Sequence, residues 1–175
     1  MSLFTEAQIY VGTYQKYNEG SIKGKWLQLA NYRNISEFYV AARKLHSDEK
    51  EPELMFQDYE YIPEGLAGEC FLKAEFFTLR DAIEQEKFDE DKIEALAIYV
   101  GHGGSGWNDD DLLEEFNEKY HGKFAKEEDF ALEFLEGDER IANLGELANY
   151  FDYDAYSRDL FLSSYWSKDG HVFSN

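Results

Sequence analysis

The sequence predicts an α+β fold, and two observations support this prediction. Apolar and polar residues alternate around Ile9 and Val11 and again over residues 22–29, and this period of two is typical of strands. From Thr78 onward the apolar residues recur every three or four positions instead, which is typical of helices. The chain therefore begins with a sheet and continues with helices, and we expect three small modules in a row.

The first module is expected to span residues 1–64 and to hold an antiparallel sheet with one helix. Residues 16–20 have turn chemistry and join the first two strands. Ser36 is placed to cap a helix over residues 37–46. Residues 54–61 are expected to form the third strand.

The second module, residues 65–106, is expected to be helical. Thr78 and Asp81 resemble a capping box at the start of a helix. The glycine-rich residues 101–106 favour a helix stop followed by a connection. Before this stop, apolar residues recur at helical spacing, namely Ile93, Leu96, Ala97 and Val100.

The third module, residues 107–175, is expected to mix helices and strands. Asn108 or Asp109 is positioned to cap its first helix. A short strand is expected around residues 123–125, a helix over residues 127–135, and further helices up to Leu162. The first helix has an apolar side, formed by Leu112, Leu113, Phe116 and Tyr120, and an acidic side, formed by Glu114, Glu115 and Glu118.

The net charge of the 175-residue chain is −20, and it is unevenly placed. Residues 1–50 hold 5 acidic and 7 basic side chains, whereas residues 51–150 hold 28 acidic and 8 basic ones. This acidity repels nucleic acid, anionic membranes and phosphate ligands, and it attracts a basic partner. The alternative is a solvated surface that only keeps the protein soluble. Because 17% of the residues are aromatic, we expect the chain to fold despite its charge.

Cys70 is the single cysteine, so no internal disulfide can form and a reducing compartment fits best. The N-terminus lacks the basic start and apolar run of a secretory signal, and no stretch of about 18 apolar residues occurs. We therefore expect a cytoplasmic protein. Beside Phe71 and Leu72, the thiol of Cys70 is expected to be buried rather than reactive.

Three patterns fit an enzyme or a metal site, and each is a weak signal. Gly101, Gly103 and Gly106 have dinucleotide-binding spacing, but residues 109–111 put three carboxylates where the phosphates would lie. These acids and residues 127–129 lack the alternating spacing of a calcium loop. Two catalytic carboxylates need only meet in space, but among 37 acids no pair stands out. We therefore expect no enzyme activity, no metal and no cofactor.

A long series of carboxylates on the expected helices is the strongest functional signal. Duplex DNA also presents a row of negative charges, about one per 1.7 Å of its axis, so such a series can imitate a phosphate backbone. We expect this acidic series to be the partner-binding surface, with the attraction summed over many carboxylates. The acidic series consists of Glu84, Glu86, Asp89, Glu90, Asp91, Glu94, Asp109, Asp110, Asp111, Glu114, Glu115, Glu118, Glu127, Glu128, Asp129, Glu133, Glu136, Asp138 and Glu139.

Three ordered landmarks run through nearly the whole chain. The first combines residues 9–11 (IYV), 16–20 (KYNEG) and 24–26 (GKW). The second is QDYEYIP, and the third is LANYFDYDAYSRDL, which ends at Leu160. Together these landmarks resemble the ArdA family of antirestriction proteins. The aromatic residues of these landmarks are expected in the core and at interfaces, and Arg158 is expected in a structural ion pair.

This resemblance implies three modules in an elongated, curved, acidic chain that forms a homodimer through its C-terminal part. It implies a non-enzymatic mimic of duplex DNA that inhibits type I restriction-modification enzymes by occupying the DNA-binding groove of their methyltransferase core. No direct binding of nucleic acid or membrane is expected. The alternative is an acidic chaperone or interaction module for another basic DNA-binding protein, and a hydrolase with a carboxylate pair ranks third.

Overall fold

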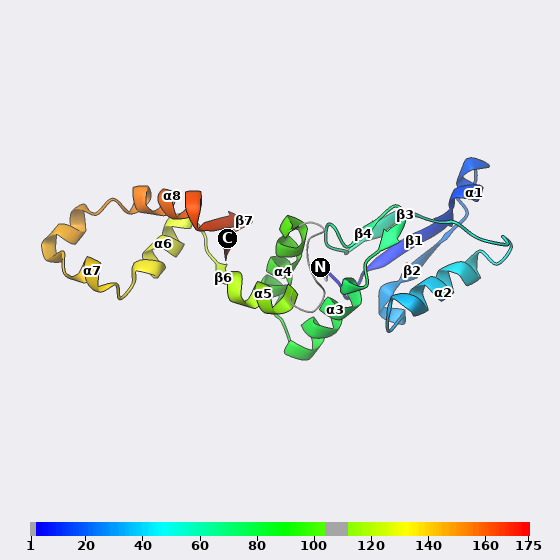
Figure 1. Ribbon diagram of the computed structural model, residues 1–175, viewed down its shortest axis with the longest axis horizontal. Coiled ribbons are helices and arrows are strands. Elements are labelled where there is room, and N and C mark those ends of the chain that lie inside the picture. Colours follow the sequence, from blue (N-terminus) through cyan, green and yellow to red (C-terminus); the bar gives the residue numbers. More distant parts are fainter. Residues whose placement is uncertain (1–2, 104–111) are drawn as a thin grey trace. The chain divides into compact units, whose positions relative to one another are not determined.

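The computed structural model describes residues 3–103 and 112–175, and it confirms the α+β fold (Figure 1). The chain forms two compact units, Met1–Leu112 and Leu113–Asn175. The first unit holds an antiparallel sheet followed by helices, and the second holds helices and a small sheet. The finer division of the first unit at residue 64 stays a prediction.

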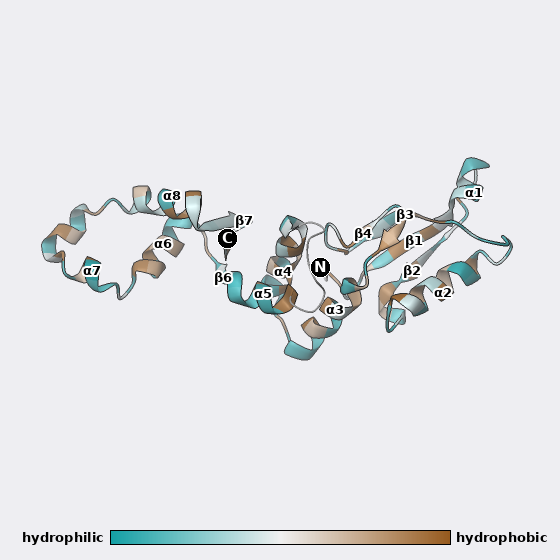
Figure 2. Cartoon of the chain, in the orientation of Figure 1, coloured by the Kyte–Doolittle hydropathy of each residue, from teal (hydrophilic) through white to brown (hydrophobic). Residues whose placement is uncertain are grey.

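A three-stranded antiparallel sheet opens the first unit. Its strands β1 (Gln8–Thr13), β2 (Lys25–Gln28) and β3 (Leu54–Glu60) lie in the order β2-β1-β3. Helix α2 (Ile35–Leu45) covers one face, and Phe38 packs edge-on against Phe56 of β3 with ring centroids 5.7 Å apart. In Figure 2, hydrophobic colours lie on β1 and β3, and these strands bury Ile9, Val11, Met55 and Phe56 in this core.

Three details of this region differ from the sequence-based expectation. Residues expected as a turn form the short helix α1 (Tyr14–Asn18), because the hydroxyl of Thr13 accepts a hydrogen bond from the Lys16 backbone N–H. Helix α2 is capped by Asn34 rather than Ser36, since the Asn34 side chain accepts the Glu37 N–H at 3.0 Å. The second strand is shorter than expected, beginning at Lys25.

Helices α3 (Glu75–Glu86) and α4 (Glu90–Gly103) follow a small hairpin of β4 (Ala67–Gly68) and β5 (Phe71–Leu72) that was not predicted. The expected capping box is wrong, because Thr78 lies inside α3. The helix begins earlier since Phe76 is fully buried and stacks on Phe4, with 5.5 Å between ring centroids. The Arg80 guanidinium also donates to the carbonyls of Leu29 and Tyr32, around the 3₁₀ helix η1 (Leu29–Asn31).

The second unit contains a three-stranded antiparallel sheet, β6 (Tyr120–Lys123), β8 (His171–Ser174) and β7 (Tyr165–Lys168), in that order. The strand that was predicted at 123–125 is found at 120–123, because these residues pair with β8. The β7–β8 hairpin was not predicted. The helical segments are α5 (Leu112–Lys119), α6 (Glu127–Leu135), α7 (Glu139–Ala142), the 3₁₀ helix η2 (Gly145–Tyr150) and α8 (Tyr153–Ser163).

Helices α6 and α8 pack through their aromatic residues. The ring of Phe130 lies 5.7 Å from that of Phe161 and 4.9 Å from that of Tyr165, in edge-on geometry. Phe173 of β8 stacks on Trp166 of β7 with a centroid distance of 4.3 Å. Between α6 and α8 the chain runs out through α7 and η2, where hydrophilic and hydrophobic residues are mixed (Figure 2).

Candidate partner-binding surface

The acidic series lies on the surface wherever the structure describes it. Most of these side chains are exposed, and Glu94, Glu115, Glu128 and Asp138 are partly exposed. None of the described members is buried. Asp109, Asp110 and Asp111, together with the expected cap at Asn108, lie outside the described residues.

In the first unit, the acidic series gathers at the junction of α3 and α4. Glu84 and Glu86 occupy the last turn of α3, and Glu90 and Asp91 the first turn of α4. Asp89 starts α4, since its carboxylate accepts the Lys92 N–H at 2.8 Å. Negative charge at a helix start is stabilised by the helix dipole, so part of this acidity also favours the fold.

In the second unit, the series follows α5, α6 and the start of α7. Three acids fill the first turn of α6, where they complement the helix dipole. The members in this unit are Glu114, Glu115, Glu118, Glu127, Glu128, Asp129, Glu133, Glu136, Asp138 and Glu139.

Some of these carboxylates are used inside the second unit. Glu115 forms an ion pair with Lys119 one turn later, with 2.8 Å between the charged atoms. Glu127 accepts a hydrogen bond of 2.5 Å from the hydroxyl of Ser167. Asp138 caps α7 and binds Arg140 at 2.6 Å, and the hydrogen bonds from the Arg140 side chain and backbone lower the pKa of Asp138 to about 2.

Ten other carboxylates of the described acidic series are available to a partner. Within the described part of the chain, their oxygens accept no hydrogen bond and form no ion pair. These free carboxylates are Glu84, Glu86, Glu90, Glu114, Glu118, Glu128, Asp129, Glu133, Glu136 and Glu139.

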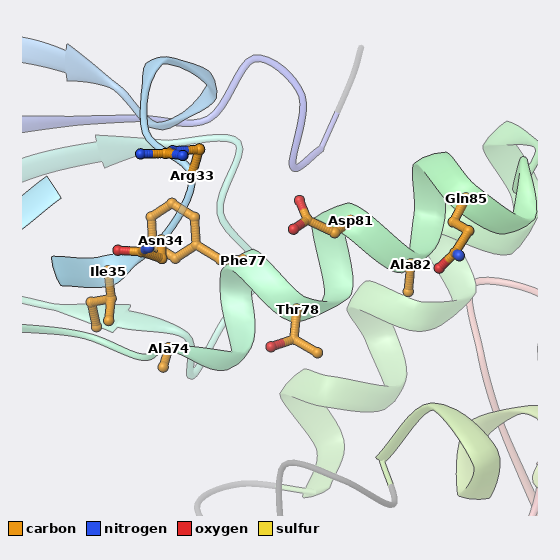
Figure 3. Close-up of a pocket in the computed structure, with 9 residues that line it drawn as sticks. All are labelled: Arg33, Asn34, Ile35, Ala74, Phe77, Thr78, Asp81, Ala82 and Gln85. Carbon is orange, nitrogen blue, oxygen red and sulfur yellow. The ribbon is translucent and has the colours of Figure 1, made fainter. Parts of the chain in front are cut away.

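A pocket between α2 and α3 offers a test of the hydrolase alternative (Figure 3). Its volume is about 480 Å³, and Arg33 and Asn34 lie at one end with Gln85 at the other. Asp81 is the acid among its lining residues, and its carboxylate accepts two hydrogen bonds from Arg80, at 2.7 and 2.9 Å. A single acid that is already paired does not provide the two unlike carboxylates that glycosidase-type chemistry uses.

The glycine pattern has the wrong surroundings for a dinucleotide site. Gly101 and Gly103 are the last turn of helix α4, whereas the dinucleotide-binding fingerprint requires a strand before the first glycine. Gly106 lies outside the described residues.

One cluster in the first unit has the composition of a metal site and was not predicted. Ligand atoms of His46, Asp48 and Glu49 lie within 4.8 Å of one another. The ammonium of Lys16 lies among them, at 2.8 Å from His46 Nδ1, 2.9 Å from Asp48 and 3.0 Å from Glu49. The built-in cation therefore occupies the position that a metal ion would take. The sequence signal was the close spacing of these three residues after α2.

The comparison with known families decides the affiliation of the chain. The family model of the antirestriction protein ArdA matches residues 9–173, nearly the full length. The chain belongs to the ArdA family of antirestriction proteins. This match confirms the resemblance that the sequence landmarks indicated. A search of curated proteins gave no significant match.

The first ArdA landmark has a structural basis in the sheet. Tyr10 of β1 packs edge-on against Trp26 of β2, and the Tyr10 hydroxyl donates to the carbonyl of Ile22. Gly24 precedes β2, where a Cβ would lie 2.5 Å from the Val11 carbonyl oxygen and 2.7 Å from the Tyr10 ring. Only glycine fits that close approach.

The structure also tests other expectations from the sequence. Tyr17 and Tyr150 are exposed, by 52% and 86%, so they are not core residues, and their place at an interface stays a prediction. Arg158 is exposed and forms no ion pair with a described residue, so the expected structural ion pair is wrong.

Cys70 is exposed rather than buried, because it lies in the turn between β4 and β5. Among the helices of the described ranges, none combines the length and apolar character of a membrane span.

Proposed function

We propose that this ArdA protein is a non-catalytic mimic of duplex DNA that inhibits type I restriction-modification enzymes by occupying the DNA-binding groove of their methyltransferase core. The observation that carries the proposal is the set of free carboxylates on α3 to α7. They are exposed, or partly exposed in the case of Glu128, they have no described partner of their own, and they belong to a chain of net charge −20.

The charge is sufficient in magnitude for this role. A homodimer would carry twice the −20 of one chain, and at one charge per 1.7 Å of axis this corresponds to about 70 Å of duplex. A basic groove that binds phosphates attracts this surface by the same electrostatic force. Because the attraction is a sum over many charges, no single exposed carboxylate is expected to be essential for binding.

Competition with DNA tests the proposal directly. A purified type I methyltransferase is bound to labelled duplex DNA and titrated with the protein at two salt concentrations. We expect displacement of the DNA at near-stoichiometric amounts, and weaker displacement at the higher salt, because salt screens the exposed charges. An enzyme–DNA complex that is unaffected at both salt concentrations would contradict DNA mimicry.

We also propose that the homodimer forms through the C-terminal part. The 3₁₀ helix η2 supports this, because it exposes apolar side chains that a lone chain leaves in water, namely Leu147 at 65% and Tyr150 at 86% exposure. Sedimentation of the full chain at micromolar concentration tests this proposal. A monomer at that concentration would contradict it.

The second candidate is an acidic chaperone or interaction module for another basic DNA-binding protein. The same free carboxylates support it, because they attract any basic surface. The competition assay separates the two: such a module binds its basic protein without displacing DNA from the type I enzyme.

A further inference from the structure

A pocket between α6 and α7 combines an apolar floor with free carboxylates. We call it the α6–α7 pocket, and its volume is about 390 Å³. The lining residues are Leu132, Glu133, Leu135, Glu136, Ile141 and Tyr153. Leu132 is 48% exposed, so the apolar part of the pocket is open to solvent.

The charge of this pocket is uncompensated. Glu133 and Glu136 are exposed members of the acidic series, and no described residue pairs with either carboxylate. Arg140 is close in sequence, but Asp138 binds its guanidinium through hydrogen bonds of 2.6 to 3.1 Å. The lining residues include no cation, so they combine two negative charges with the apolar side chains of Leu132, Leu135 and Ile141.

We propose that the α6–α7 pocket receives one arginine side chain of the basic partner. The methylene stem packs on Leu132 and Ile141, and the guanidinium binds Glu133 and Glu136. An arginine side chain suits both parts, because its stem is apolar and its head group is charged. Arginine fits better than lysine, because its planar group offers several donors to two carboxylates and can stack on the ring of Tyr153. This inference rests on the proposed function, in that the partner is a basic protein.

The pocket would add a specific anchor to the summed electrostatic attraction. A phosphate backbone has no apolar floor, so a pure mimic would bind the partner only through charge. An anchor of this kind makes a few residues contribute more than their charge, as in the hot spots of other protein interfaces.

A matched pair of double variants tests the anchor in the DNA-competition assay. Glu133→Gln with Glu136→Gln removes two charges at the pocket, and Glu114→Gln with Glu118→Gln removes two free charges on α5. We expect the concentration for half-displacement to rise at least tenfold more for the pocket variant than for the α5 variant. Equal effects would overturn the proposal, because they follow from summed charge alone.

A second pair of variants leaves the charge unchanged. Leu132→Ala shortens the floor of the pocket, whereas Val40→Ala removes the same kind of atoms from an exposed position on α2, which is 65% exposed. We expect about three- to tenfold weaker displacement for Leu132→Ala and no change for Val40→Ala. A thermal melt first shows whether each variant is folded. If folded Leu132→Ala displaces DNA as well as the wild type does, the contact with the pocket floor is contradicted.

A direct titration keeps the inference distinct from the proposed function. If the wild-type protein displaces no DNA, the proposed function fails, but the pocket is still tested by NMR with N-acetyl-arginine amide. We expect saturable shifts of the Leu132 and Ile141 methyl signals that disappear in the Glu133→Gln, Glu136→Gln variant. No shift would overturn the pocket, and equal shifts with N-acetyl-lysine amide would overturn the assignment to arginine. Conversion of the double variant to a different oligomeric state would reassign the pocket to a subunit interface.

Discussion

The Lys16 ammonium and the His46 imidazole form a buried pair, with 2.8 Å between Nζ and Nδ1. The other ring nitrogen of His46 lies 3.2 Å from the carbonyl oxygen of Val11, which can only accept a hydrogen bond. His46 therefore carries its proton on Nε2 and presents a lone pair to Lys16. Because Asp48 and Glu49 accept from the same ammonium, one lysine ties α1 to the segment after α2.

Replacing Lys16 by Met is expected to destabilise the protein. The variant leaves the His46 lone pair without its donor and leaves the Glu49 carboxylate with the Thr13 hydroxyl alone, at a cost of about 1–3 kcal/mol in the free energy of unfolding. Chemical denaturation of the full chain measures the effect, with Lys44→Met on the exposed side of α2 as the control. Equal stability of the two variants would show that the Lys16 cluster contributes nothing net.

The advantage of wild type over Lys16→Met is expected to depend on pH. Lys16 hydrogen bonding lowers the pKa of Asp48 below 3.8. Burial raises the pKa of Glu49, but bonds from Thr13 and Lys16 outweigh it and lower the value below 4.5. This stabilisation is therefore fully present above about pH 4.5 and is lost as the pH falls through the lowered pKa values. Thermal melting of both proteins from pH 7 to pH 2 measures it, and a difference that grows in acid contradicts the assignment.

The stability difference between the wild type and Lys16→Met is expected to persist in alkaline solution. Burial lowers the pKa of Lys16, but its hydrogen bonds to Asp48 and Glu49 raise it above the ordinary 10.5. The stabilisation is present below that ordinary value and is lost only as the pH rises through the raised pKa. Denaturation at pH 9 and pH 10 is expected to give the same difference between wild type and Lys16→Met as at pH 7. A difference that disappears by pH 9 would place the Lys16 pKa below its ordinary value.

Asp138 is expected to titrate far below a free aspartate. Hydrogen bonds from the Arg140 side chain and backbone hold its pKa at about 2, so its capping of α7 is lost only as the pH falls through that value. Carboxyl NMR of the wild type measures the midpoint. Arg140→Ala is expected to move it toward 3.8, whereas Lys126→Ala leaves it in place. An unchanged midpoint in Arg140→Ala argues against the ion pair.

Gly24→Ala is expected to weaken the first sheet. The added Cβ would lie 2.5 Å from the Val11 carbonyl oxygen, and backbone must shift to admit it, at a cost of about 1–3 kcal/mol. Gly101→Ala is the matched control, because its Cβ would meet Glu64 at 3.4 Å and is expected to change the stability by about 0.5 kcal/mol or less. The denaturant midpoint of each variant is compared with that of the wild type. Similar losses of stability in the two variants would contradict the steric argument.

Neutralising acids outside the α6–α7 pocket is expected to act cumulatively. Glu118→Gln removes one free carboxylate and is expected to raise the concentration for half-displacement of DNA by less than about threefold, since exposed charges interact weakly. Adding Glu114→Gln, Glu128→Gln and Asp129→Asn is expected to raise it further at each step. One all-or-none carboxylate among these four would count against summed attraction.

Local patterns in the sequence were sufficient for the long elements and for the family. The helix over Glu127–Leu135 was predicted with its observed bounds, because its apolar residues and its acidic first turn are both local signals. The ArdA landmarks were readable as a resemblance, although their packing is not local, since Gly24 lies against Val11 and Trp26 packs on Tyr10 of a different strand. The short hairpins were missed, because two-residue strands such as β4 carry no periodicity.

The sequence by itself determined the acidity, its concentration after residue 50, the α+β class and the ArdA affiliation. Tertiary structure decided how each acid is used: it assigned Asp138 to Arg140, left Glu133 and Glu136 free beside an apolar pocket, and exposed Cys70. It also brought Lys16 to His46, thirty positions away. The physical reason is that composition and periodicity are properties of neighbours in the chain, whereas hydrogen bonds and burial depend on neighbours in space.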